Sequence, residues 1–572
     1  MGFYFLGIFL FIILLSFSVS VIVEKELKYT ISFSFFSIIL WMYIGGLFLD
    51  LRLVFGMLLV CYGITVGYGI YRIRGKWKEK IKQYLYDPIL LLYFLLFLIF
   101  LSFNFNRHIS YIDEYRHWGT VVKAMWESHQ LSFHMDYIMY PSYPPAISLL
   151  QYTFISLCGF YSENILFITF YLFGASLMLP FLKVTRKNFF FSLILAFFLP
   201  TVLFTSYYNC IYVDGLLGIL FAFSMLFITK KIGKHTEKFD LTLLTLSLVA
   251  LTLLKDIGFY FALIAILYWG ITLKVKKIDQ WKSFFLLATV VILTRFSWSL
   301  CLSLFDTPLQ HQNAMPLKEI GNLITLQWND VQTGVISQFL KSFFQLKIIS
   351  DPITLDYISI LIVFILGAYW IYHRSKKEER KILKYFNVLM IGGAILYPLT
   401  LLLMYLFQMD PYDAVRLSSY DRYIVIFINA VLIAGMLLIF ERFQKPKDYI
   451  IGICIFCLFV PYAQILGWFD QRDLNLDREW REIGILAKEH DVLIYDPTLL
   501  EIEYAKVRYY MNVTSKENLN HITIASSFDE NKIEDYDYIY LKRVPELLEG
   551  KVEKDKIYQV RDDGSLKLIY SI

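Results

Sequence analysis

The sequence predicts an α-helical polytopic membrane protein that ends in a small α/β domain. Hydrophobic residues make up 57% of the 572 residues and charged residues only 18%, whereas soluble domains usually carry about 25% charged residues. Apolar runs long enough to cross a bilayer recur along the chain and stop near Trp468. The 51 Phe and 42 Tyr residues suit lipid-facing surfaces and interfacial belts.

The first apolar run, Gly2 to Val23, has the length of a full span and lacks both a basic flank and a small-residue cleavage site. We therefore expect a retained helix rather than a signal peptide. Further spans are expected at roughly 30–50, 53–71, 88–103, 143–159, 163–182, 188–206, 212–229, 240–254, 256–273, 283–304, 355–372, 385–407, 422–440 and 448–468. The total is 13 to 15 transmembrane helices. The helices of residues 1–87 form an N-terminal addition to a membrane core at 88–470.

Short basic loops predict the orientation, because positively charged loops remain on the cytoplasmic side. These loops are 72–82, 230–234, 274–282, 373–381 and 441–447. Loops 104–142 and 305–354 and the tail after Asp470 then lie outside the cell membrane. The basic loop Lys183 to Lys187 conflicts with this pattern, since two apolar segments separate it from loop 104–142. Either one of the segments 143–159 and 163–182 is partial or re-entrant, or this loop breaks the rule.

Residues 471–572 have the composition of a soluble domain. Strands are expected at Val492–Tyr495 and Tyr536–Leu541, helices at Leu499–Tyr510 and Pro545–Lys556, and a terminal hairpin around Asp563-Gly564. The segment contains no glycine-rich phosphate loop, metal-ligand spacing or nucleophile elbow. An accessory, extracytoplasmic α/β domain is therefore expected.

An acidic pair, Asp113-Glu114, stands out in the otherwise apolar chain. It follows the apolar segment 88–103 and precedes the proline-rich stretch 140–145, which places two carboxylates at a membrane face. Ionisable groups at such positions are costly and are usually retained for function. The same stretch contains His117 and Trp118, side chains that transfer protons or stack on sugar rings. The alternative is a solvated loop that happens to contain acids.

Other classes of site fit the sequence poorly. The six cysteines fall mostly inside apolar segments and have no ligand-like spacing with histidine, so neither a zinc site nor a disulfide framework is expected. The net charge is only +5 and the basic residues are dispersed, which argues against nucleic acid as a partner.

Four further short motifs follow the acidic pair along the chain. Tyr143-Pro-Pro145 opens a helix, and Asp214 lies at the start of the next external helix in Tyr212-Val-Asp-Gly215. A lysine interrupts two apolar segments in Leu254-Lys-Asp-Ile-Gly258, and an arginine lies at a late helix mouth in Tyr420-Asp-Arg-Tyr423. In this order, and with a soluble external tail, the chain resembles the C-type (GT-C) membrane glycosyltransferases, which include protein mannosyltransferases and the aminoarabinose lipid A transferase. Here three apolar segments precede the core, whereas the family often has the acidic loop directly after its first helix.

The resemblance implies transfer of a sugar from a polyprenyl-phosphate donor. Asp113 is the expected general base for the acceptor hydroxyl, and Glu114 orients the site or forms a salt bridge with Arg116 or Arg107. The leaving phosphate requires cations at external helix ends. The candidates for this role are Lys255, Arg416 and Arg422.

The remaining candidate residues have two interpretations each. Asp214 either shares a divalent cation, Mg²⁺ or Mn²⁺, with Glu114 or caps its helix. Five residues are expected to contact the sugar or the acceptor, namely His117, Trp118, Tyr143, Asp214 and His311. Solvation or anchoring at the membrane interface is the alternative for these side chains.

The sequence therefore predicts a multi-pass cell-membrane enzyme whose active site faces outward and whose acceptor is a glycan, lipid or protein of the cell envelope. Two alternatives remain open. One is a polysaccharide polymerase or ligase that acts on diphosphate-linked glycans and relies more on arginine and histidine in a large late loop. The other is a transporter or flippase for lipid-linked sugars, in which the embedded charges form a translocation path.

Overall fold

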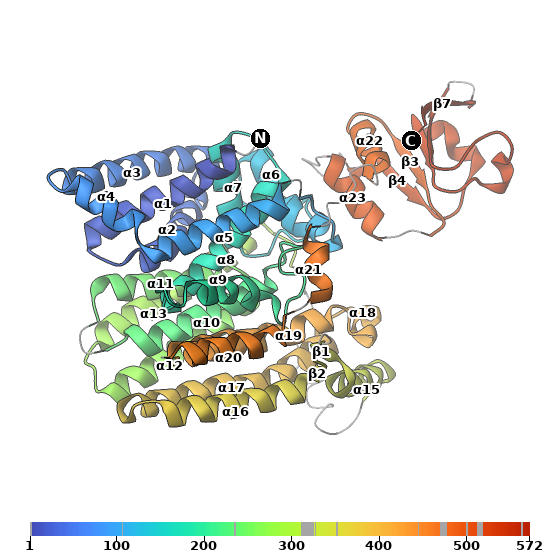
Figure 1. The fold of residues 1–572 in the computed structure, drawn as a ribbon. Coiled ribbons are helices and arrows are strands. Elements are labelled where there is room, and N and C mark those ends of the chain that lie inside the picture. The colour runs from blue at the N-terminus through green and yellow to red at the C-terminus, as the bar shows by residue number, and fades with distance from the viewer. Residues whose placement is uncertain are drawn as a thin grey trace.

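The structure is a computed structural model of the chain. It describes residues 3–105, 107–233, 236–309, 325, 328–349, 353–443, 445–460, 462–469, 477–498, 501–511, 519–561 and 564–571. Most of these residues are helical. The long helices lie side by side in one bundle, and the C-terminal sheet region projects from one end of it (Figure 1).

The N-terminal helices, coloured blue, lie on one side of the bundle (Figure 1). They are α1 Phe3–Val23, α2 Leu27–Gly46, α3 Leu51–Arg72, α4 Trp77–Leu85 and α5 Pro88–Asn104. Asp50 begins α3 by accepting the backbone N–H groups of Arg52 and Leu53. Asp87 begins α5 in the same way, and Pro88 occupies the first position of that helix. The chain bends by 55° between α4 and α5, so the capped start of α5 coincides with a change of direction.

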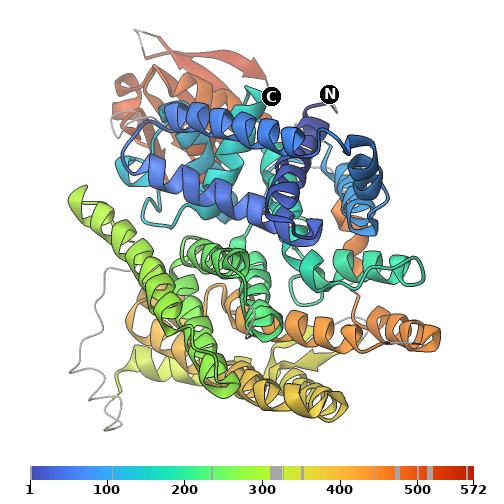
Figure 2. The same ribbon diagram turned by 90° about the vertical axis from the view of Figure 1, so that its left-hand side faces the viewer.

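The middle and late helices complete the bundle. They are α6 Gly119–Ser128, α7 Ala146–Cys158, α8 Glu163–Met178, α9 Phe189–Phe198, α10 Val213–Lys231, α11 Lys238–Thr252, α12 Asp256–Lys276, α13 Trp281–Leu304, α15 Asp330–Gln345, α16 Tyr357–Arg374, α17 Lys377–Phe407, α18 Pro411–Arg416, α19 Tyr420–Glu441, α20 Pro446–Cys457 and α21 Tyr462–Phe469. The blue N-terminal helices and the yellow helices α16 and α17 lie on opposite sides, with the green helices between them (Figure 2). Helix α10 packs along α19, where a Cβ on Gly218 would approach the Ile426 carbonyl oxygen to 3.0 Å. The absence of a side chain at Gly218 allows this close helix approach.

Among the described residues, ten helices are long and apolar enough to cross a membrane, or eleven if the bent pair α4–α5 forms one span. This number is lower than the 13 to 15 transmembrane helices expected from the sequence. The predicted spans at 143–159, 188–206, 240–254 and 448–468 contain shorter helices. Helix α7, for example, has 13 residues, or about 20 Å at 1.5 Å per residue, whereas the hydrocarbon core is about 30 Å thick. Hydropathy does not separate α7 from a span, because α7 is apolar but is buried against other helices over most of its length.

The short α7 also resolves the conflict over the basic loop 183–187 in favour of a partial element. Glu163, at the start of α8, contacts His108 beside the acidic pair, so the end of α8 lies toward the other end of the bundle. Lys183 lines a cavity there with Lys25 and Arg72. The loop thus lies with the other basic loops.

The basic loops predicted to be cytoplasmic gather at one end of the bundle. Lys230 Nζ lies 2.5 Å from Glu441 Oε2, and Arg442 Nη2 lies 3.6 Å from Glu379 Oε2. These contacts join three of the predicted cytoplasmic loops. Asp113 and the C-terminal sheet lie toward the opposite end (Figure 1).

The C-terminal region contains α22 Arg478–Leu486, α23 Glu501–Met511 and a five-stranded sheet in the order β4-β3-β5-β6-β7. The strands are β3 Val492–Tyr495, β4 Ile522–Ala525, β5 Tyr538–Leu541, β6 Lys556–Val560 and β7 Leu566–Ser571. Strand β3 pairs in parallel with β4 and β5, while β5, β6 and β7 pair antiparallel.

Most of the predicted C-terminal elements are confirmed. The strands β3 and β5, the helix α23 and the terminal hairpin β6–β7 lie where they were expected. The predicted helix at Pro545–Lys556 is wrong, because only a single turn, Glu546–Leu548, is helical. Gly550 and Asp555 adopt positive φ angles of 79° and 56° in this segment, and such residues interrupt a right-handed helix.

Candidate active site

A cavity of about 700 Å³ lies where several membrane helices end. Its walls come from the π-helical turn η1, Glu114–Trp118, from the N-terminal ends of α10, α12 and α19, and from the residues that follow α17. Seven of the ten residues predicted for the site line this cavity: Asp113, His117, Trp118, Tyr143, Asp214, Lys255 and Arg422. The structure therefore brings together residues that are far apart in the sequence.

Four charged side chains alternate in sign along the cavity. Arg422 Nη1 donates to Asp113 Oδ2 at 2.6 Å, and Arg422 Nε lies 3.1 Å from Asp214 Oδ2. Lys255 Nζ donates to Asp214 Oδ1 at 2.6 Å. The Asp214 side chain is only 2% exposed, so its charge requires compensation by nearby cations. The cluster holds two acids and two bases and is balanced in charge.

Two tyrosine rings position the arginine. The Arg422 guanidinium lies 4.5 Å from the centre of the Tyr212 ring and 5.1 Å from that of Tyr423. Its Nη2 donates to the Tyr423 hydroxyl at 3.3 Å. The Nε group of Arg422 is buried. It lies close to Asp214, but this contact does not have the geometry of a hydrogen bond, so Nε has no hydrogen-bond partner among the described residues. A donor is thus held in place beside the cavity.

Glu114 has a different environment from Asp113. Its carboxylate is fully buried and accepts the backbone N–H groups of Ser110 at 2.7 Å, Tyr111 at 2.9 Å and Ile211 at 2.9 Å. Burial raises the pKa of Glu114 to about 7, although these three hydrogen bonds oppose the rise. The residue fastens η1 to the segment that leads into α10. It therefore fixes the backbone next to Asp113 and does not line the cavity.

The predicted metal pair does not fit this geometry. Glu114 directs its oxygens to backbone N–H groups, and both oxygens of Asp214 already contact cationic side chains. The described residues also contain no group of three or more His, Cys, Asp or Glu side chains that could hold a metal ion. In this arrangement the two carboxylates do not fit a shared Mg²⁺ or Mn²⁺ site. The salt bridge considered for Glu114 is replaced by its backbone contacts.

Aromatic side chains form one wall of the cavity. Trp118 and Tyr143 stack with ring centres 5.5 Å apart and planes 6° apart. His117 packs edge-on to Tyr143 at 4.6 Å. Burial, with a smaller contribution from Lys255, lowers the pKa of His117 to about 3. The imidazole is therefore neutral near pH 7 and is suited to hydrogen bonding rather than to acid catalysis.

Two predicted site residues are not placed in the cavity. Arg416 is exposed on α18, donates to the Tyr412 hydroxyl and stacks on the Tyr412 ring at 3.8 Å. It does not line the cavity that contains Lys255 and Arg422. His311 lies outside the described residues.

A second, largely apolar cavity of about 530 Å³ adjoins the first. The two share Tyr143, Lys255, Gln408 and Tyr423 in their walls. The second cavity continues between α12, α17 and α19. Tyr260 and Leu396 line it and are 64% and 60% exposed on the outer surface of the helices. A polar cavity thus adjoins an apolar one that reaches the outer surface of the helices.

Sequence reasoning missed the two tyrosines that hold Arg422. Tyr212 and Tyr423 are direct or near neighbours of the predicted residues Asp214 and Arg422, and that proximity was the only signal available. Tyr212 also accepts the Asp113 backbone N–H through its hydroxyl at 3.3 Å.

A scan against known protein families finds no family that matches this chain, and a search of curated proteins finds no relative.

Proposed function

We propose that the protein is a membrane glycosyltransferase that moves a sugar from a polyprenyl-phosphate donor to a cell-envelope acceptor. The observation that carries this proposal is that the charged cavity and the apolar cavity lie side by side and share wall residues. A polyprenyl-phosphate sugar has a polar head and a long apolar tail, so it requires adjacent sites of these two kinds. The aromatic wall formed by Trp118 and Tyr143 supplies flat faces for a sugar ring.

The charged residues have complementary roles in this reaction. Asp113 accepts the proton of the acceptor hydroxyl while the hydroxyl oxygen attacks the anomeric carbon of the donor sugar. The bond between that carbon and the phosphate oxygen breaks, and the phosphate leaves with the electron pair. Arg422 and Lys255 stabilise the charge that develops on the leaving phosphate.

The ion pairs suggest how donor binding prepares the base. In the structure Asp113 shares Arg422 with Asp214. A donor phosphate that binds the guanidinium competes with Asp113 for it, and this competition releases a carboxylate oxygen for the acceptor hydroxyl. The buried Arg422 Nε offers a further hydrogen bond to the phosphate.

The proposed reaction places the site and the C-terminal domain outside the cell membrane, with residues 441–447 and the other basic loops inside. Ser526 is exposed just after β4, so a Ser526→Cys variant should react with a membrane-impermeant thiol reagent in intact cells. The control is a Ser526→Cys sample labelled after lysis, compared with the unsubstituted protein. Protection of Cys at this position until the cells are lysed would show the opposite orientation.

The proposed function is tested with purified protein in lipid nanodiscs and a panel of radiolabelled polyprenyl-phosphate monosaccharides. Release of polyprenyl phosphate, separated from the donor by thin-layer chromatography, is the expected result. A polymerase or ligase would instead release polyprenyl diphosphate from diphosphate-linked glycans. A flippase would move the donor between leaflets of a proteoliposome without cleaving it. Either of these outcomes would contradict the proposal.

A further inference from the structure

A third cavity, of about 500 Å³, lies at the junction between the membrane bundle and the C-terminal domain. Helix α6 and η1 form one wall, and α22, α23, β3 and β4 form the other. Its volume falls within the range of about 300–1,000 Å³ that is typical of ligand sites. We call it the junction cavity.

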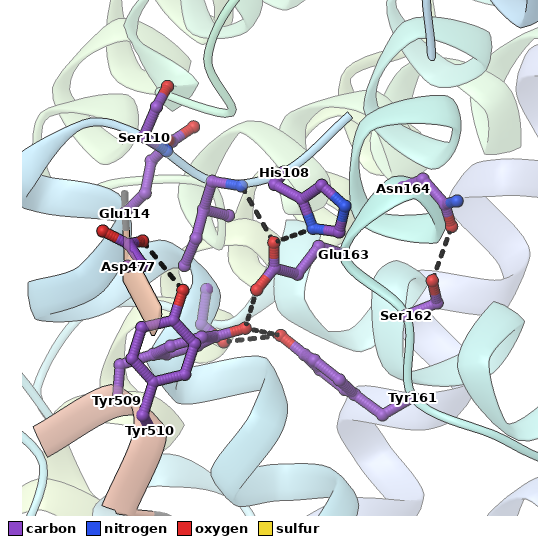
Figure 3. Close-up of polar contacts among 12 residues, drawn as sticks. His108, Ser110, Glu114, Tyr161, Ser162, Glu163, Asn164, Asp477, Tyr509 and Tyr510 are labelled. Atoms are coloured by element: carbon purple, nitrogen blue, oxygen red, sulfur yellow. Dashed lines mark hydrogen bonds and ion pairs between the residues drawn. The ribbon is translucent and has the colours of Figure 1, made fainter. Parts of the chain in front are cut away.

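Hydrogen bonds hold the two walls of the junction cavity in a fixed relation. Glu163 of α8 accepts from His108 Nδ1 at 2.9 Å and from the Tyr509 hydroxyl at 2.6 Å, and Tyr509 also bonds to Tyr161 at 3.0 Å (Figure 3). These contacts tie α23 to the membrane bundle. They form one of two buried polar clusters at the junction.

The second cluster centres on Asp477, whose side chain is completely buried. It accepts the hydroxyls of Tyr115 at 3.0 Å and Tyr510 at 2.9 Å, and it lies 2.9 Å from Lys506 Nζ. Such satisfied buried networks stiffen the elements that they join. The cavity between the domains is therefore a built feature rather than a loose gap.

Two of the three basic side chains that line the junction cavity, Lys123 and Arg508, donate to backbone carbonyl groups, and Arg116 is the third. Lys123 Nζ donates to the Tyr509 carbonyl at 2.8 Å, and Arg508 Nη2 donates to the Tyr137 carbonyl at 2.6 Å. Burial lowers the pKa of Lys123 to about 8. Lys123 and Arg508 are thus poorly placed to attract an anionic ligand.

Three acidic residues, Glu127, Asp496 and Glu503, also line the cavity. Asp496 Oδ1 already accepts the backbone N–H and the hydroxyl of Thr498 at 2.8 and 2.6 Å. Asp496 directly follows the parallel strand β3, the end of a strand at which α/β folds bind ligands. Glu503 lies beside it on α23, and Glu127 comes from α6 across the cavity. Glu503 Oε2 is buried and accepts no hydrogen bond from the described residues. Such oxygens accept hydrogen bonds from hydroxyl and ammonium groups.

Aromatic rings complete the walls. Tyr504, Tyr137 and Trp480 line the junction cavity among these carboxyl groups. Aromatic faces combined with hydrogen-bond acceptors suit the apolar faces and hydroxyl edges of a pyranose ring. The residues of the cavity therefore favour a neutral or amino sugar over a phosphate, a sulfate or an acidic sugar.

The turn η1 separates the junction cavity from the candidate active site. Tyr115 lines the junction cavity, His117 lines the active-site cavity, and Arg116 lines both. A chain of sugars in the junction cavity could therefore extend past Arg116 toward Asp113.

We propose that the junction cavity binds the acceptor, an oligosaccharide of neutral or amino sugars, and directs its terminal hydroxyl to Asp113. This inference rests on the proposed glycosyltransferase function and adds the class of acceptor and its binding site. Tyr504 and Glu503 are the residues assigned to sugar contact.

The first measurement is binding of the full-length protein in nanodiscs to an array of neutral, amino-sugar and acidic oligosaccharides. Tyr504→Ala and Glu503→Gln should each weaken binding to neutral or amino sugars by about tenfold or more, the loss expected for one contact to a charged or aromatic group. Matched controls are Leu547→Ala and Glu549→Gln, which change exposed residues of the same domain outside the cavity. These controls should bind within about twofold of the parent protein.

The second measurement separates this inference from the proposed function. Slow release of polyprenyl phosphate to water, without added acceptor, is measured in the parent protein and in the controls Leu547→Ala and Glu549→Gln, where it should be equal. Transfer to the bound oligosaccharide should fall in Tyr504→Ala and Glu503→Gln. If the variants lose glycan binding but the parent protein cleaves no donor, the sugar-binding site stands and the glycosyltransferase proposal is refuted. Absence of binding to neutral and amino sugars, preference for acidic ones, or equal binding by folded variants would overturn the inference.

Discussion

Asp113→Asn should lower the rate of sugar transfer by about 10²–10⁴-fold, or about 3–5 kcal/mol of barrier. The substitution is nearly isosteric and removes the proton acceptor, while Arg422 and Lys255 remain available for the phosphate. The fall should therefore appear in kcat, and the apparent KM for the donor should not rise. Steady-state kinetics with the polyprenyl-phosphate donor measure both quantities.

Two comparison variants make this result specific. Asp421→Asn removes an exposed carboxylate that lines the cavity next to Arg422. It should keep the rate within about threefold, because the ion pairs of Arg422 are with Asp113 and Asp214. Glu114→Gln should lower the free energy of unfolding by about 1–3 kcal/mol. In the parent protein the Glu114 carboxylate accepts backbone N–H groups, whereas the glutamine N–H₂ group would face one of these donors. If Glu114→Gln folds but is inactive, while Asp113→Asn retains more than about a third of the rate, then Glu114 is the base and Asp113 has the positioning role. Full activity in both would remove the main support for a glycosyltransferase.

The sequence predicted the long helices and the C-terminal hairpin well, because both rest on local patterns. Helices such as α1 and α19 are continuous apolar runs, and the hairpin β6–β7 alternates on either side of Asp563-Gly564. The number of spans could not be predicted in the same way. Segments such as α7 are as apolar as spans but bury their side chains within the protein, and hydropathy does not distinguish protein from lipid as the apolar surroundings.

The residues predicted for the site come together where each lies near the start of a helix at the same end of the bundle. Asp214, Lys255 and Arg422 lie at the starts of α10, α12 and α19, so parallel packing brings them together. The pairing of Asp113 with Arg422, 309 residues away, depends on the tertiary structure and has no local signal. The opposite environments of Asp113 and Glu114 arise from the turn η1, which the spacing of the acidic pair does not reveal.

Arg416 shows how a local turn can mislead a motif argument. It lies six residues before Arg422, yet Leu417 and Ser419 between them adopt positive φ angles of 52° and 61°. These left-handed residues reverse the chain between α18 and α19. The two arginines consequently face different surroundings, one exposed on α18 and one at the charged cluster.

Arg422→Lys should lower kcat/KM for the polyprenyl-phosphate donor by about 10–100-fold, which corresponds to the loss of one or two hydrogen bonds to charged groups. Arginine here reaches Asp113 and Asp214 at the same time and lies against the rings of Tyr212 and Tyr423. Lysine keeps the charge but provides a single point of contact on a flexible stem, so it cannot hold a carboxylate and a phosphate in one plane. The measurement is the donor dependence of polyprenyl-phosphate release, together with the melting temperature of the variant.

Arg416→Lys is the matched control, because the same substitution is made on a nearby helix outside the cavity. It should leave donor kinetics unchanged, and its melting temperature sets the effect of an arginine-to-lysine change at the surface. If Arg422→Lys has unchanged kinetics and normal stability, Arg422 only neutralises Asp214 and anchors α19, and the phosphate must be held by other groups. If both variants lose donor use equally, the exposed face of α18 belongs to the site, and the cavity near Asp113 does not define it alone. A loss of kcat that is confined to Arg422→Lys, and that neither saturating donor nor a lower temperature restores, would place the guanidinium at the leaving phosphate in the transition state. A bidentate donor has its largest effect there.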